Sequence, residues 1–124
     1  MVLIDTSYWI DHLHGQDPRI QVLLDHRRVV MHPFVLGELA LGNLKSREIV
    51  LNLLRKLPQA EVAQPREVLE LVDRYALFGR GIGYVDVALV ASVRLTPGAT
   101  LMTRDRRLHE VAMELKLAFG DSKG

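Results

Sequence analysis

The sequence predicts an α/β domain in which a short, mainly parallel β-sheet is flanked by α-helices. Short apolar runs alternate with amphipathic helical patterns along the whole chain, as expected for strands joined by helices. No long linker, low-complexity tract or internal repeat interrupts this alternation. The composition, 48% hydrophobic and 25% charged, is that of a globular protein, and we therefore expect one domain over residues 1–124.

The first half of the chain alternates buried strands with helices that have one apolar face. Hydroxyl groups at Thr6 and Ser7 are suited to capping the first helix, and Pro33 is suited to the first turn of a later one. The expected elements, in order, are a strand at Val2–Ile4, a helix carrying Trp9, Ile10 and Leu13, a weaker helix carrying Ile20, Val22, Leu23 and Leu24, a strand at Val29–Met31, a helix from Pro33 to Gly42, and a helix carrying Val50, Leu53, Leu54 and Leu57.

The second half repeats the alternation, with one helix that is apolar nearly all round and should be buried. A glycine-rich turn, from Gly79 to Gly83, precedes that helix. The expected elements are a short strand at Glu61–Ala63, a helix carrying Val68, Leu71, Val72 and Tyr75, the buried helix Val87–Leu95, a strand at Ala99–Met102, a helix carrying Leu108, Val111, Ala112 and Leu115, and an edge strand at Leu117–Phe119.

Composition excludes several classes of function. The formal net charge is +1, so any contact with nucleic acid would depend on a local basic patch. The chain has no cysteine, which excludes disulfides and zinc sites built from thiolates. There is no signal-peptide pattern and no apolar run long enough to span a bilayer, so we expect a cytoplasmic protein without a membrane partner.

Four acidic residues stand within or directly after apolar runs: Asp5, Glu38, Asp86 and Asp105. Buried carboxylates are rare unless they are paired or bind a metal, and no basic residue occupies a matching core position. In an α/β domain the functional crevice lies beyond the carboxyl ends of the strands, where Asp5 and Asp105 fall. The three aspartates are equally well placed to cap helices, and the two roles can coexist.

The basic residues that could contact a phosphate lie close to one of these acids. Arg104, Arg106 and Arg107 surround Asp105, and Arg80 lies in the glycine-rich turn. The alternative for the first three is a solvated first turn of the last helix, and Arg80 is the weaker candidate.

Four segments of the chain resemble a PIN domain and, more narrowly, the VapC toxins of bacterial toxin–antitoxin pairs. They are VLIDTSYWID at the start, the helical VLGELALG, the segment GYVDVALVA and the closing LMTRD. The resemblance covers essentially the whole chain, in the family's order and spacing. Many relatives carry asparagine where this chain has Asp105, so its acidic set is the fuller one.

The resemblance implies a metal-dependent endoribonuclease that cuts RNA and thereby inhibits translation. Asp5, Glu38, Asp86 and Asp105 match the family's four acids in order, and Thr103 matches the hydroxyl residue that supports the last one. It also implies a homodimer that is held inactive by a cognate VapB-like antitoxin. Which RNA is cut, whether transfer, ribosomal or messenger RNA, is left open.

The chemistry of the acids agrees with that implication. Carboxylates hold one or two Mg²⁺ or Mn²⁺ ions while leaving positions for water and phosphate oxygens. We expect Asp5, Asp86 and Glu38 to contribute most directly to the metal site, with Asp105 completing it or orienting the attacking water.

Two other classes compete with the nuclease. A phosphoacceptor receiver domain would need adjacent acids after the first strand and a late functional lysine, whereas Asp5 stands alone and Lys116 falls in the last helix. A non-catalytic PIN-like module acting through protein contacts would not need the full acidic set.

Overall fold

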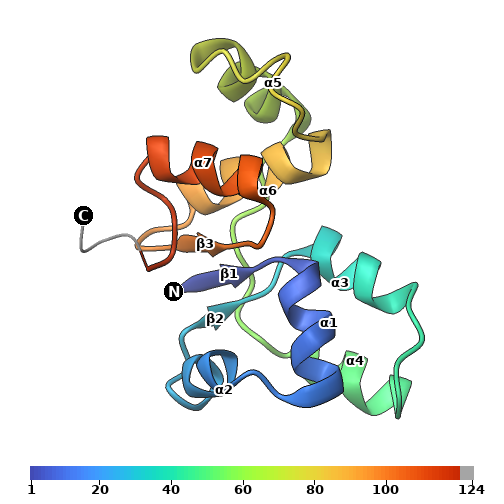
Figure 1. Ribbon diagram of the computed structural model, residues 1–124. Helices are drawn as coiled ribbons and strands as arrows, with labels where there is room; N and C mark the ends of the chain where they lie inside the picture. Colours follow the sequence, from blue (N-terminus) through green and yellow to red (C-terminus); the bar gives the residue numbers. More distant parts are fainter. Residues whose placement is uncertain (121–124) are drawn as a thin grey trace.

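A three-stranded parallel sheet lies at the centre of the computed structural model, which describes residues 1–120 (Figure 1). The strands are β1 (Val2–Ile4), β2 (Val29–Val30) and β3 (Thr100–Met102), in the order β2-β1-β3. The central position of β1 fits its three fully buried residues, because a strand paired on both edges is enclosed by its neighbours. The predicted α/β class and parallel pairing are confirmed.

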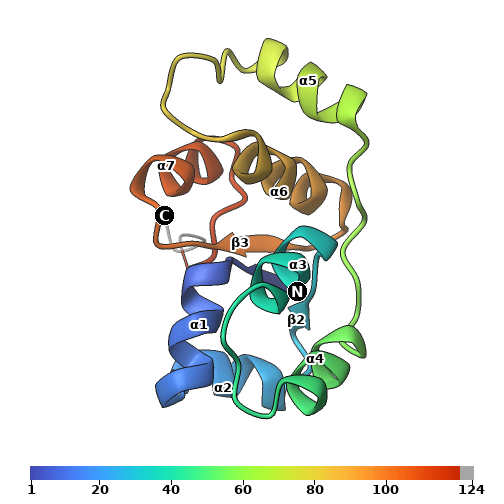
Figure 2. The ribbon, with the colours of Figure 1, turned by 90° about the vertical axis from the view of Figure 1, so that its right-hand side faces the viewer.

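Seven helices connect and cover these strands within the described residues. Two views show α5, α6 and α7 on the β3 side of the sheet and α1, α2 and α4 on the β2 side (Figures 1 and 2). Within residues 1–120 no helix is both long and apolar enough to cross a membrane. The helices are α1 (Thr6–Gly15), α2 (Pro18–Asp25), α3 (Pro33–Ala40), α4 (Arg47–Arg55), α5 (Pro65–Arg74), α6 (Tyr84–Leu95) and α7 (Arg106–Glu114).

The core follows most of the predicted apolar faces, but several of their residues are exposed, among them Ile10 at 41% and Val22 at 55%. Helix α6 is buried without interruption from Val87 to Val93, as its all-round apolar sequence predicts. In α4 the buried residues are Leu51 and Leu54, whereas Leu53, which was predicted to face the core, is 60% exposed. The spacing of apolar residues could not tell the buried face of α4 from the exposed face, because leucines occur on both.

One predicted strand is wrong, and another is reduced to a single bridge at its predicted place beside β3. At 61–63 the chain is irregular, because the backbone N–H of Glu61 donates to Thr96 Oγ1 (2.9 Å) and that of Ala63 donates to Ser92 Oγ (3.1 Å). Hydroxyl groups of α6 thus take the donors that a neighbouring strand would have used. At 117–119 only Ala118 forms an isolated parallel bridge, beside β3.

Candidate metal centre at the carboxyl edge of the sheet

Asp5 is fixed at the point where β1 ends and α1 begins. Its backbone N–H donates to the carbonyl of Met102 (2.9 Å), which ties it to the end of β3. Its Oδ1 accepts the backbone N–H of Thr6 (2.8 Å), and its Oδ2 accepts the hydroxyl of Thr103 (2.8 Å). Asp5, and not a hydroxyl residue, is therefore the N-cap of α1, and its half-buried carboxylate is held on both oxygens.

Thr103 links Asp5 to the fourth acid. It is buried directly after β3, and its hydroxyl accepts the backbone N–H of Asp105 (3.1 Å) while donating to Asp5. Asp105 in turn caps α7, since its Oδ1 accepts the backbone N–H of Leu108 (3.0 Å). The predicted capping role of Asp105 is confirmed, and its exposed side chain keeps one oxygen without a hydrogen bond inside residues 1–120.

Glu38 reaches the same edge from α3, which follows β2. The apolar neighbours of Glu38 in the sequence predict a face that meets little water unless the helix is peripheral. The helix proves to be peripheral, because Glu38 is exposed, and Phe34 and Leu41 on that face are 40% and 90% exposed. The Thr6 hydroxyl donates to Glu38 Oε1 (2.5 Å) and so joins α1 to α3. The sequence showed Thr6 only as a capping residue; its place directly after Asp5 was the signal for this second contact.

Asp86 lies in the first turn of α6 but does not cap it. The helix begins at Tyr84 and its N-cap is Gly83, so the predicted capping alternative for Asp86 is wrong. Partial burial raises the pKa of the Asp86 carboxyl, and the charges of Asp5, Asp105 and Glu38 raise it further; a hydrogen bond from the backbone of Gly83 opposes them. Asp5, Asp105 and Glu38 therefore all lie near enough to Asp86 to act on its carboxyl group, and the structure gathers the four predicted acids at one edge of the sheet.

The donor set fits a hard divalent cation. It consists of carboxylate oxygens supported by hydroxyl groups, which is the chemistry that Mg²⁺ and Mn²⁺ prefer. In the described part of the chain none of the four acids forms an ion pair, and a cation would relieve their repulsion. No group of three histidine or acidic side chains in residues 1–120 already encloses a metal position, so binding would draw the carboxylates together.

Two of the predicted phosphate ligands are already paired. Arg80 donates to both carboxylate oxygens of Glu114 (2.8 and 2.6 Å). Arg104 forms an ion pair with Asp11 and lies over the ring of Tyr8, with 4.5 Å from its guanidinium carbon to the ring centroid. Both arginines would have to leave these partners to bind a phosphate.

Arg106 and Arg107 are the unpaired members of the basic set within residues 1–120, and both are exposed. The guanidinium of Arg107 lies against Gly81, where any side chain would collide with it. Gly81 also has a positive φ of 77°, which glycine adopts without strain. The absence of a side chain at Gly81 therefore leaves room for the guanidinium of Arg107 beside the glycine-rich turn.

The chain is similar to known proteins over nearly its full length. Residues 2–114 match the family model of the PIN domain. The chain is 47% identical over 121 residues to proteins named Ribonuclease VapC32 from two strains of Mycobacterium tuberculosis, CDC 1551 / Oshkosh and ATCC 25618 / H37Rv, with 98% of each chain covered. With the match spanning nearly its full length, this chain belongs to the PIN-domain family and, within it, to the VapC-like proteins.

Proposed function

We propose that this protein is a metal-dependent endoribonuclease that hydrolyses RNA phosphodiester bonds and acts as the toxin of a VapBC-type pair, inhibiting translation in the cytoplasm. The observation that carries the proposal is the group of four carboxylates at the carboxyl edge of the sheet: burial and the charges of the other three raise the pKa of Asp86, and none of the four has a cationic partner within residues 1–120. The names of the two relatives, both ribonucleases, support RNA as the substrate.

Asp5, Asp86 and Glu38 are the proposed ligands of Mg²⁺ or Mn²⁺, with Asp105 completing the site or orienting the attacking water. Such an ion, when bound, stabilises charge on the phosphate and makes a water molecule more acidic. The carboxylate of Asp5 is held in place by Thr103, and that of Glu38 by Thr6. These hydrogen bonds restrict the rotation of two ligand side chains before metal arrives, which lowers the cost of drawing the carboxylates together.

The substrate phosphates are proposed to contact Arg106 and Arg107, which flank the crevice at the start of α7 without an ion pair in the described residues. Arg104 and Arg80 become secondary candidates because each already has a carboxylate partner. The sequence alone had ranked Arg104 equally with Arg106 and Arg107 as a phosphate ligand.

A VapB-like antitoxin is the proposed partner, and an apolar groove offers it a surface. The groove, about 310 Å³, lies between α1, α2 and α4. Trp9 is 1% exposed and belongs to the core, yet it forms part of the groove wall beside the exposed Leu53. A homodimer is also proposed, and exposed Leu41 and Phe78 are apolar side chains that a second copy could cover.

Cleavage of RNA by purified, antitoxin-free protein tests the function directly. The wild type is compared with Asp5→Asn, and with Asp17→Asn as a matched control, because Asp17 caps α2 away from the four acids. Chelator-sensitive cutting by the wild type and Asp17→Asn, and none by Asp5→Asn, is expected. A folded wild type that binds Mn²⁺ but cuts no RNA pool would favour the non-catalytic binding module instead.

A further inference from the structure

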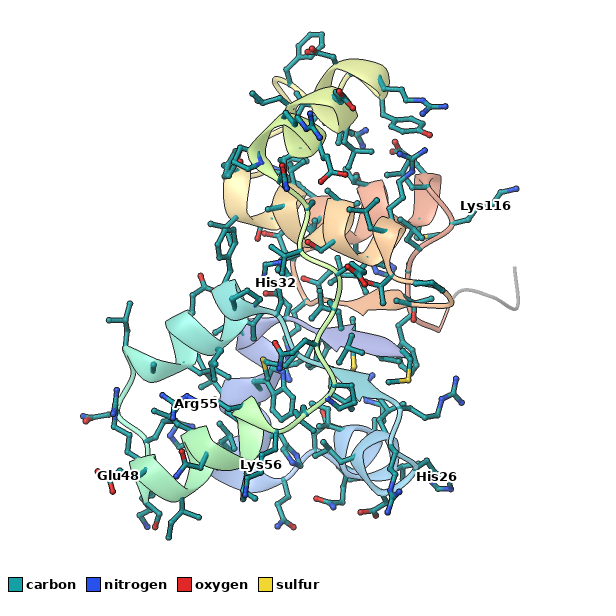
Figure 3. The ribbon with its side chains drawn as sticks, turned by 180° about the vertical axis from the view of Figure 1, so that it is seen from behind. His26, His32, Glu48, Arg55, Lys56 and Lys116 are labelled. Carbon is teal, nitrogen blue, oxygen red and sulfur yellow. The ribbon has the colours of Figure 1, made fainter. Side chains whose placement is uncertain are left out.

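A buried histidine stands where β2 gives way to α3. His32 is 0% exposed, and Figure 3 labels it at the start of α3, close to α6. Its Nδ1 accepts the backbone N–H of Phe34 (3.0 Å) and thereby caps α3. Because that nitrogen must be unprotonated, the neutral ring carries its proton on Nε2, which donates to Ser92 Oγ (3.0 Å). Burial lowers the pKa of His32, which keeps the ring neutral near pH 7.

Ser92 is the point at which three segments meet. It is also 0% exposed, and its hydroxyl accepts a second hydrogen bond from the backbone N–H of Ala63 (3.1 Å). The hydroxyl thus joins the cap of α3, helix α6 and the irregular segment that replaces the predicted third strand. These hydrogen bonds should be rigid, because breaking one would leave a buried donor or acceptor without a hydrogen-bond partner.

The hydrogen bond between His32 and Ser92 joins the two helices that carry Glu38 and Asp86. His32 begins the helix that carries Glu38, and Ser92 lies on the helix that carries Asp86. Between residues 1 and 120 no other hydrogen bond joins α3 or its cap to α6. Helix α3 packs mainly against α1 and α4, and the Thr6 hydroxyl also holds Glu38, so the hydrogen bond from His32 to Ser92 is the direct polar link that ties α3 to the helix of Asp86.

We propose that His32 and Ser92 are positioning residues that set the separation of Glu38 and Asp86, and hence the geometry of the proposed metal site. The inference rests on the proposed function for its catalytic consequence, but the separation of the two helices can be measured without metal or RNA. Breaking the hydrogen bond between His32 and Ser92 should let α3 move relative to α6 while leaving the contacts of Asp5 with Thr103 intact.

Three variants separate positioning from ordinary stability. Ser92→Ala removes the shared hydroxyl. His32→Asn keeps a side-chain oxygen that can cap α3 but is too short to reach Ser92. Thr96→Ala is the matched control: it removes the hydroxyl of the α6 C-cap, which accepts the N–H of Glu61 (2.9 Å) in the same irregular segment and donates to the backbone carbonyl of Ser92 (2.8 Å), but has no hydrogen bond to α3 or to the Ser92 hydroxyl.

The first measurement is the distance between spin labels at exposed positions of the two helices. The chain has no cysteine, so Leu41→Cys and Leu95→Cys, 90% and 42% exposed, give one specific label pair. We expect a broader or shifted distance distribution in Ser92→Ala and His32→Asn, and a wild-type distribution in Thr96→Ala. A wild-type distribution in Ser92→Ala would overturn the inference whatever the RNA assay shows.

The second measurement is metal binding and turnover. Ser92→Ala and His32→Asn should need about tenfold more Mn²⁺ for half-saturation and should lower kcat for RNA cleavage with KM unchanged, because distorted ligand geometry weakens binding and transition-state stabilisation. The double variant should be no worse than either single one. An equal Mn²⁺ shift in Thr96→Ala would show a general loss of stability and refute positioning. If the wild type neither binds Mn²⁺ nor cuts RNA, but the distance between α3 and α6 still changes in Ser92→Ala, the result counts against the proposed function and not against the positioning role.

Discussion

Asp86→Asn is expected to stabilise the protein in the absence of divalent metal and to leave it less stable than the wild type when metal is present. Burial and the charges of Asp5, Asp105 and Glu38 raise the pKa of the Asp86 carboxyl above the ordinary 3.8. A carboxyl group with a raised folded-state pKa binds more protons in the folded protein, so stability falls as pH rises from 3.8 through that pKa. At pH 7 without metal the neutral asparagine avoids this penalty, and the variant should melt above the wild type.

With metal present, the wild type should melt above Asp86→Asn. Free Mn²⁺ at 100 times its Kd would stabilise the wild type by about 2.7 kcal/mol. For a chain of 124 residues each kcal/mol raises Tm by about 4 °C, so the wild type should gain about 10 °C. If loss of the charged ligand weakens binding about 100-fold, the same Mn²⁺ concentration gives the variant only about 0.4 kcal/mol, or about 2 °C.

Thermal denaturation at pH 7, in chelator and in Mn²⁺, measures both effects. Asp17→Asn is the control: burial works to raise the pKa of Asp17, but hydrogen bonds from Arg19 outweigh it and lower the pKa overall. That charge contributes stability above pH 3.8 which is lost as pH falls, so the control should melt below the wild type at pH 7 and keep the full Mn²⁺ gain. A full Mn²⁺ gain in Asp86→Asn, or a lower Tm in chelator, would refute the reasoning.

Three further outcomes follow from the same contacts. Thr103→Val removes the hydroxyl held 2.8 Å from Asp5 Oδ2; cleavage at saturating Mn²⁺ should fall about 10- to 100-fold, and Thr103→Ser should retain activity in the same assay. Arg107→Gln should reduce the slope of log K against log salt for RNA binding by about 1, measured on the inactive Asp5→Asn background, whereas Arg80→Gln should leave the slope unchanged. Leu53→Lys should leave cleavage unaltered but raise the antitoxin concentration needed for inhibition, because the lysine places a charge in the apolar groove.

The sequence was most informative where a local rule and the global fold required the same residue. The acids Asp5 and Asp105 were predictable because each ends a strand and begins a helix, and both positions proved to be caps at the carboxyl edge. The helices were predictable from apolar spacing, and the buried α6 most clearly of all. In these cases periodicity and capping chemistry depend only on nearby residues.

The failures arose where distant partners decide the structure. The apolar segment at 61–63 does not become a strand because Ser92 and Thr96, about thirty residues away, take its backbone donors. The apolar sequence neighbours of Glu38 predict a shielded face unless α3 is peripheral, and α3 turns that face outward. The contacts of Thr6 with Glu38, and of Arg104 with Asp11, also join separate elements, which no local pattern encodes.

The carboxylate of Asp5 both caps α1 and is a proposed metal ligand. A useful substitution at this position must remove the ligand and keep the cap. Its Oδ1 accepts the N–H of Thr6 at the start of α1, while Oδ2 accepts the hydroxyl of Thr103 beside the crevice. Alanine would remove the cap, at about 1 kcal/mol, together with the proposed ligand, so lost cleavage could reflect a loosened helix. Asparagine caps helices as well as aspartate does. It removes the charge and puts an amide donor in place of Oδ2, so the Thr103 hydroxyl has to accept where it donated to Asp5. An Asp5→Asn protein that melts near the wild type in chelator but gains nothing from Mn²⁺ therefore assigns lost cleavage to the ligand and not to the fold.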